Sequence, residues 1–157
     1  MIQRIQSVYL LLAGLVLAFS FCTPQIVFCG ADGDVATLCA TGIASLSQTI
    51  APLGSSISTP WGVACFTIVA CLMAFGAIFM FKNRKRQIKM VNGLLIAILL
   101  IYVSDLAYAY AFNAHHGTSM RGAWGVVLPF VAYVLCWLAR RSVRKDEALV
   151  RAADRIR

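Results

Sequence analysis

Four long apolar stretches limit what this chain can fold into. They cover roughly residues 8–28, 61–81, 90–112 and 122–139 and hold few charged side chains. About 20 apolar residues in a helix are enough to cross the hydrocarbon layer of a bilayer. Over the 157 residues, 61% are hydrophobic and 13% are charged, where a soluble domain has about 25% charged. The sequence therefore predicts an all-α membrane protein, a single domain built as a bundle of four transmembrane helices.

The 14 Lys and Arg residues gather on one side of such a bundle. Arg4 precedes the first stretch, a central run occupies residues 82–89, a third group occupies 140–157, and only Arg121 lies elsewhere. Because Lys and Arg stay on the cytoplasmic side of a membrane, we expect a bacterial inner-membrane protein with both termini in the cytoplasm. The net charge of +8 then reflects topology, and we expect no nucleic-acid partner.

The segments outside the spans have distinct expected structures. Residues 29–59 form a long first extracytoplasmic loop without a basic residue, and its middle is expected to form short strands or an interfacial helix. Residues 140–157 are basic and amphipathic, which predicts a short cytoplasmic helix. Pro129 falls inside the fourth span and is expected to kink it.

Both ends of the chain and its centre carry a family resemblance. The start MIQRIQ, the stretch NRKRQIK at residues 83–89 and the end DEALVRAADRIR resemble a family of four-span inner-membrane proteins from the Bacteroidetes group, catalogued as a domain of unknown function. The resemblance covers essentially the whole chain. It implies the four-span topology, and it implies no activity, cofactor or catalytic residue.

Asp105 is the sharpest candidate for a functional side chain. It lies in the third span, with Tyr102 three residues before it and Tyr108 three residues after it. An ionisable residue inside a span is costly and is usually paired, turned inward or placed in a wet cavity. Two interpretations stay open: a structural polar contact, with the hydroxyls of Tyr102 and Tyr108, Arg121 or interfacial water as the partner, and a polar pathway in a small oligomeric transporter or channel.

Two cysteines fall in the long outer loop. Cys29 and Cys39 would lie in an oxidising compartment, where a disulfide between them is plausible, with Cys22 as a competing thiol. A thiol oxidoreductase built on this pair is a third and weaker hypothesis, because the chain has no CxxC motif of the redox type. The adjacent His115 and His116 have no further ligand at metal-binding spacing, so we expect no metal site and no cofactor.

The leading hypothesis is a non-enzymatic accessory or scaffold protein of the membrane. Its basic cytoplasmic face would bind anionic lipid headgroups or a membrane or cytoplasmic protein, and a homo-oligomer stays open. The residues expected to dock are Lys82, Arg84, Lys85, Arg86, Lys89, Arg151, Asp154, Arg155 and Arg157.

Overall fold

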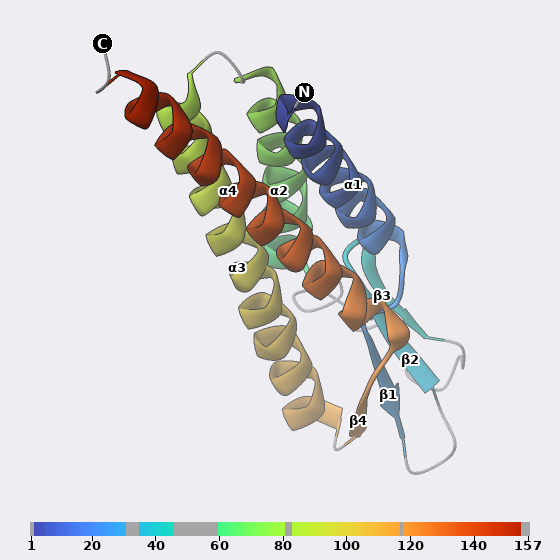
Figure 1. Cartoon of the computed structure of the whole chain (residues 1–157). Coiled ribbons are helices and arrows are strands. Elements are labelled where there is room, and N and C mark those ends of the chain that lie inside the picture. Colours follow the sequence, from blue (N-terminus) through green and yellow to red (C-terminus); the bar gives the residue numbers. More distant parts are fainter. Residues whose placement is uncertain (1, 31–34, 46–59, 81–82, 117, 155–157) are drawn as a thin grey trace.

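The strands lie together at one end of the molecule, beside the C-terminal part of α3, and the other helices extend away from them (Figure 1). The computed structural model describes residues 2–30, 35–45, 60–80, 83–116 and 118–154. Within these ranges the helices are α1 (Ile2–Cys22), α2 (Trp61–Phe79), α3 (Arg84–His116) and α4 (Val127–Asp154), and the 3-10 turn η1 (Trp124–Val126) precedes α4. The strands are β1 (Ile26–Cys29), β2 (Val35–Cys39), β3 (Gly42–Ser45) and β4 (Ser119–Gly122).

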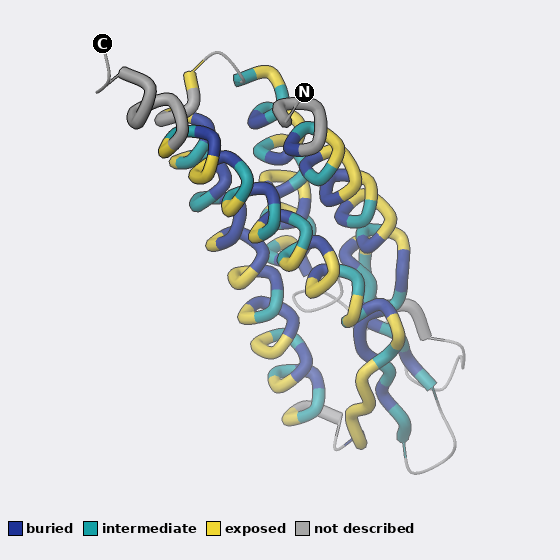
Figure 2. The backbone as a smooth tube through the Cα atoms, in the orientation of Figure 1, coloured by how far each residue is buried: buried dark blue, intermediate teal, exposed yellow. Residues whose placement is uncertain are grey.

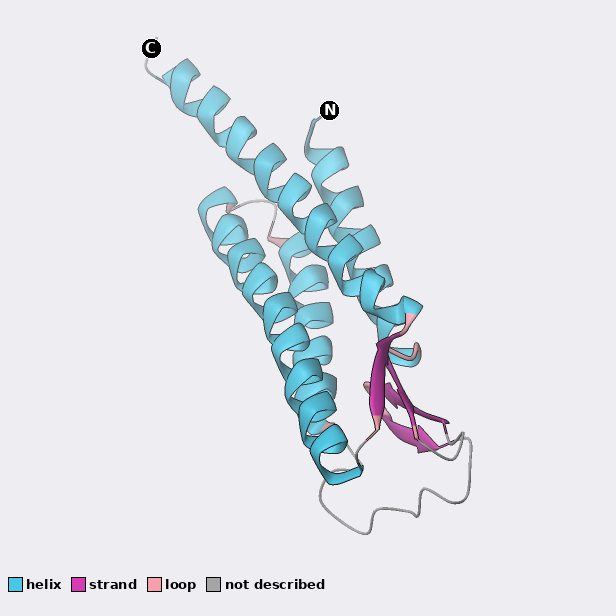
Figure 3. Cartoon of the chain, turned by 90° about the horizontal axis from the view of Figure 1, so that it is seen from below, coloured by secondary structure: helices cyan, strands magenta, loops and turns pink. Residues whose placement is uncertain are grey.

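The four helices form an up-and-down bundle. Helix α1 packs on α2 and α4, and α3 packs on the same two neighbours, while successive helices run in opposite directions (Figures 1 and 3). Buried positions alternate by three and four residues along each helix, which is typical of left-handed bundles. The buried positions with this spacing are Gln6, Leu10, Ala13, Leu17 and Ser20 in α1, Val63, Thr67, Ala70, Ala74 and Ala77 in α2, Gln87, Val91, Leu94, Ile98, Ile101 and Asp105 in α3, and Ala132, Cys136, Ala139, Val143 and Asp146 in α4, and α3 also buries Leu95, Ala97, Ser104, Ala109 and Phe112.

Small residues fill much of this core, while large apolar residues face outward. Leu72 is 66% exposed, Phe79 80% and Leu106 69%, and exposed positions follow the outer sides of the helices (Figure 2). Small side chains let helix backbones approach closely, and outward apolar ones suit contact with lipid. By length and composition, the segments Trp61–Phe79, Arg86–Ala114 and Trp124–Ala148 can each cross a membrane, and Gln6–Cys22 is a shorter apolar helix.

The helix bounds differ from the expected spans. Helix α1 ends at Cys22 and is followed by β1, so the expected continuation of the first span through residue 28 is wrong. Pro24 cannot continue a helix, and the backbone N–H and hydroxyl of Thr23 both donate to the carbonyl of Ser20 at the helix end. Helix α3 is longer than the expected span 90–112. It begins at Arg84, so the basic stretch that was expected to be a loop forms its first turns, and it ends at His116.

Helix α4 also differs from its prediction. It begins at Val127 and continues without a break to Asp154, so residues 140–154 extend the fourth helix instead of forming a separate short one. Pro129 is the third residue of α4. The expected kink is therefore wrong, because the first-turn N–H groups of a helix have no partner within the helix that a proline could remove.

A four-stranded antiparallel sheet covers the other end of the bundle, in the order β3-β2-β1-β4. Strands β2 and β3 thus give residues 35–45 the first of the two structures expected there, strands rather than an interfacial helix, and the sheet is an addition to the expected all-α fold class. Residues 46–59 lie outside the described part. Strand β4, which follows α3, pairs with β1 so that Met120 lies opposite Phe28. The Phe28 ring packs on Phe112 of α3, with ring centroids 4.4 Å apart. Thus one small core joins the sheet to the helices.

Candidate functional site

The buried carboxyl group of Asp105 lies where α3 meets the sheet. Its side chain is 3% exposed, on the buried seam of α3. The amide of Gln25, which is fully buried just before β1, faces it. In the orientation that pairs donor with acceptor, Nε2 of Gln25 donates to Oδ1 of Asp105 at 3.2 Å and also to Oδ2. Each group therefore offsets the cost of burying the other.

Gln25 connects three elements at this point. Its backbone N–H donates to the carbonyl of Leu38 in β2 at 2.8 Å, and its own carbonyl accepts from the N–H of Ala123 at 2.9 Å. Its side chain reaches Asp105 in α3. The polar groups of one residue thus hold the sheet, the entry to α4 and helix α3 together.

The two tyrosines beside Asp105 bind other groups. The Tyr102 hydroxyl donates to the carbonyl of Val126 at 2.7 Å. The Tyr108 hydroxyl accepts from the backbone N–H of Gly62, in the first turn of α2, at 3.2 Å. Neither of these hydrogen bonds is to the carboxyl group of Asp105, which differs from the expectation. Each hydroxyl instead connects α3 to a different neighbouring segment.

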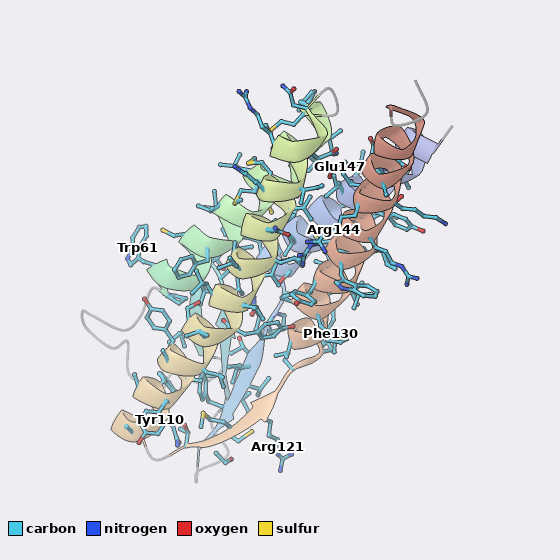
Figure 4. All side chains as sticks on the ribbon, turned by 60° about the vertical axis from the view of Figure 1, so that its left-hand side comes forward. Trp61, Tyr110, Arg121, Phe130, Arg144 and Glu147 are labelled. Carbon is cyan, nitrogen blue, oxygen red and sulfur yellow. The ribbon has the colours of Figure 1, made fainter. Side chains whose placement is uncertain are left out.

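Arg121 is not the partner of Asp105 within the described structure. It is an exposed residue of β4, opposite Val27 of β1, and Figure 4 shows it at the sheet end of the molecule. Arg121 lies on the surface of the sheet, whereas the carboxyl group of Asp105 is buried between α3 and the sheet. The partner of Asp105 is therefore Gln25, which lies 80 residues earlier in the chain. This contact supports the interpretation of Asp105 as a structural polar group.

The structure does not bring Cys29 and Cys39 together. They stand at opposite ends of the β1–β2 pair, because Cys29 lies opposite Val35 while Cys39 lies one residue beyond the Ile26–Leu38 pair. Four residues of a strand span about 13 Å, whereas a disulfide needs Cα atoms within about 7 Å. Both thiols are free, so the expected disulfide is wrong. Burial raises the pKa of the Cys39 thiol, a hydrogen bond with Thr37 opposes this rise, and the nearby Cys22 adds to it.

A second buried polar contact lies at the opposite end of the bundle. The amide of Gln6 in α1 donates to Oδ2 of Asp146 in α4, and both side chains are almost fully buried. Nearby in the fold, Gln87 of α3 donates to the carbonyl of Ala77 in α2 at 3.2 Å. Sequence reasoning missed these contacts, although the spacing of three and four residues places each polar side chain on its helix's buried seam.

The basic docking residues are only partly described. Arg86 and Lys89 are exposed on the first turns of α3. Lys82, Arg155 and Arg157 lie outside the described residues, as do the side chains of Arg84, Lys85, Arg151 and Asp154 and those of His115 and His116. Among the side chains that are described, no group of three or more His, Cys, Asp or Glu is placed to hold a metal ion.

Four residues of α4 form a basic cavity that sequence reasoning did not single out. Trp137, Arg140, Arg141 and Arg144 line a cavity of about 190 Å³. Their positions, i, i+3, i+4 and i+7, place them on one face of a helix. The sequence contains this spacing, but the whole of residues 140–157 is basic, so these four residues do not stand out from their neighbours.

The comparison with known families decides the relationship of this chain. A family model described as "Domain of unknown function (DUF4293)" matches residues 2–156. The chain belongs to this family. The DUF4293 match includes both ends, where Gln6 meets Asp146, and it confirms the family resemblance expected from those ends. No curated protein matches the chain.

Proposed function

We propose that this chain is a four-span protein of the bacterial cytoplasmic membrane that acts as a non-enzymatic scaffold. Both termini lie in the cytoplasm in this proposal. The end of α4 stands out from the membrane as a basic arm, defined as residues 140–154, and the arm docks on lipid headgroups or on a protein at the inner surface.

The outward face of α1 supports a fourth crossing. Leu11 is 44% exposed, Leu15 52% and Phe19 57%, and in a soluble protein such an apolar row would be unfavourable. The pairing of β1 with β4 places the two outer loops on the same side of the bundle. Four antiparallel helices with these loops at one end are what four crossings require.

The single observation that carries the proposal is the bond between Gln6 and Asp146. Helix α4 has 28 residues and rises about 42 Å, more than the roughly 30 Å hydrocarbon layer. Its last turns would therefore project from the membrane. Because Asp146 is bound to α1, the arm is held in a set direction, with the exposed Arg144 and Lys145 on its surface. Figure 4 shows Arg144 on this part of α4, far from Arg121.

Site-specific photo-cross-linking tests the scaffold. A photoreactive amino acid at the exposed position of Lys145 should give a discrete adduct in cells, and the adduct's mass separates a lipid from a protein. The matched position is the exposed Met120 on β4, which should not give that adduct. In a Gln6→Ala background the yield from position 145 should fall, because the arm loses its attachment to α1. The proposal fails if position 145 gives no adduct, or if position 120 gives the same one.

A transporter or channel using Asp105 is the second candidate, favoured by the burial of an acid inside a span. The Gln25 amide can donate to a carboxylate or, turned over, accept from a carboxylic acid, so it can serve either protonation state. Proton or ion flux into liposomes should then fall in an Asp105→Asn variant. Equal flux in both proteins, or none in either, removes this candidate.

A further inference from the structure

The cavity on α4 combines positive charge with an aromatic ring. Three arginines and Trp137 line it on one helix face. The guanidinium carbon of Arg141 lies 5.9 Å from the centroid of the Trp137 ring, within the range of a cation–π contact. This contact draws Arg141 toward the apolar part of α4. The cavity therefore has an apolar wall on one side and guanidinium groups on the other.

Arg140 has a donor that the described structure does not satisfy. Its Nε is buried, and no hydrogen-bond acceptor within the described residues pairs with it. A buried donor of a charged group is unfavourable when it is unpaired. An anion in the cavity would supply an acceptor next to this residue.

The position of the cavity along α4 points to a membrane surface. The apolar run of α4 ends at Ala139, and Trp137 is 47% exposed two residues before it. Exposed Trp residues near the end of a span lie at the level of the lipid headgroups. Arg140, Arg141 and Arg144 follow within the next two turns. Their guanidinium groups then lie among the phosphates of the headgroup layer.

We infer that Trp137, Arg140, Arg141 and Arg144 form a binding site for the phosphate group of an anionic phospholipid in the cytoplasmic leaflet. Arginine presents paired N–H donors that match phosphate oxygens, while Trp137 can pack against the lipid beside the phosphate. The assignment to the cytoplasmic leaflet rests on the proposed function, in which both termini lie in the cytoplasm. The site itself depends only on the depth of the cavity.

Quenching of Trp137 fluorescence by brominated lipids tests the site. In full-length protein carrying Trp61→Phe and Trp124→Phe, Trp137 is the single tryptophan of the chain. In nanodiscs, brominated phosphatidylglycerol should quench it more strongly than brominated phosphatidylcholine. Removing the exposed Arg144 alone, as Arg144→Gln, should lower the selectivity by more than the roughly five-fold that the loss of any one positive charge near an anionic surface gives. Lys145→Gln is the matched control, since Lys145 is exposed and adjacent but does not line the cavity.

Each result separates the site from its alternatives. A loss of selectivity in Arg144→Gln that exceeds the loss in Lys145→Gln, which removes the same charge from the adjacent position, supports the site. Equal losses in both overturn it, because general electrostatic attraction then explains the preference. The site is also overturned if the intact protein shows no preference for brominated phosphatidylglycerol. It is overturned as well if millimolar inorganic phosphate abolishes the preference, because that result would show a site for the free anion. Because nanodiscs expose both faces, failure of the proposed orientation or of the Lys145 cross-link leaves this test unchanged.

Discussion

The Gln25–Asp105 pair makes a quantitative prediction about the stability of the bundle. Asp105→Leu removes the acceptor and leaves the fully buried Gln25 amide unpaired, which costs about 1–3 kcal/mol of the free energy of unfolding. Gln25→Leu leaves the buried carboxyl group of Asp105 without its amide and should cost at least as much. Because the double variant leaves neither group unpaired, its loss should be smaller than the sum of the two single losses.

The expected coupling energy follows from the environment of the pair. Hydrogen bonds between membrane helices couple by roughly 0.6 kcal/mol on average and up to about 1.7 kcal/mol. The Gln25 amide is fully buried and faces both carboxyl oxygens, so we expect a value in the upper half of that range, about 1–1.7 kcal/mol. Asp105→Asn keeps an acceptor oxygen toward Gln25, and its loss should stay below about 1 kcal/mol.

Unfolding in SDS from mild detergent micelles, followed by far-UV circular dichroism, measures these free energies for the four proteins of the cycle. Arg121→Gln is the control, because this exposed residue of β4 is not bound to either group. A coupling energy below about 0.3 kcal/mol would mean that the two losses are additive. That result would refute the bond and, with it, the structural role assigned to Asp105.

Two further predictions concern the same end of the molecule. Gly125→Ala should destabilise the protein by about 1–3 kcal/mol. An added Cβ would overlap the carbonyl oxygen of Pro24 and would lie 2.9 Å from its carbonyl carbon. Gly122→Ala is the control in the same unfolding assay and should be nearly neutral, because its added Cβ has no atom within 4 Å. The Cys39 thiol, whose pKa is raised by burial, should form less thiolate at pH 8 than it does in SDS-unfolded protein. Its alkylation, measured by peptide mass spectrometry, should therefore be slower in the folded protein and keep rising above pH 9, and equal rates in the two states would contradict the burial.

Much of the helical architecture could be predicted from local patterns. Helix α2 begins at Trp61 as expected, and each of the other helices overlaps its expected span, although their bounds differ from the expected ones by four residues or more at each end. The bounds failed where tertiary contacts set them. Helix α4 begins at Val127 because the preceding chain pairs as β4 and then turns through η1. Pro129 accordingly falls in the first turn of α4, where it breaks no hydrogen bond.

The candidate site was predictable only in part. Asp105 stood out because a carboxyl group inside an apolar helix is rare, and the structure places it on the buried seam. Its partner was not predictable, since Gln25 lies in another element and gives no local signal. The disulfide prediction failed for a related reason: Cys29 and Cys39 are close in the sequence, but the register of β1 on β2 separates them.

The sequence by itself determined the apolar helices, the clustering of basic residues at the start, centre and end of the chain, and the family, because hydropathy, charge and residue identity can be read position by position. Only the tertiary structure decided which polar groups meet. It joined Gln6 to Asp146 at one end of the bundle and Gln25 to Asp105 at the other, and it paired β4 with β1. These contacts link segments far apart in the chain, and they depend on helix packing and strand register, which no local pattern records.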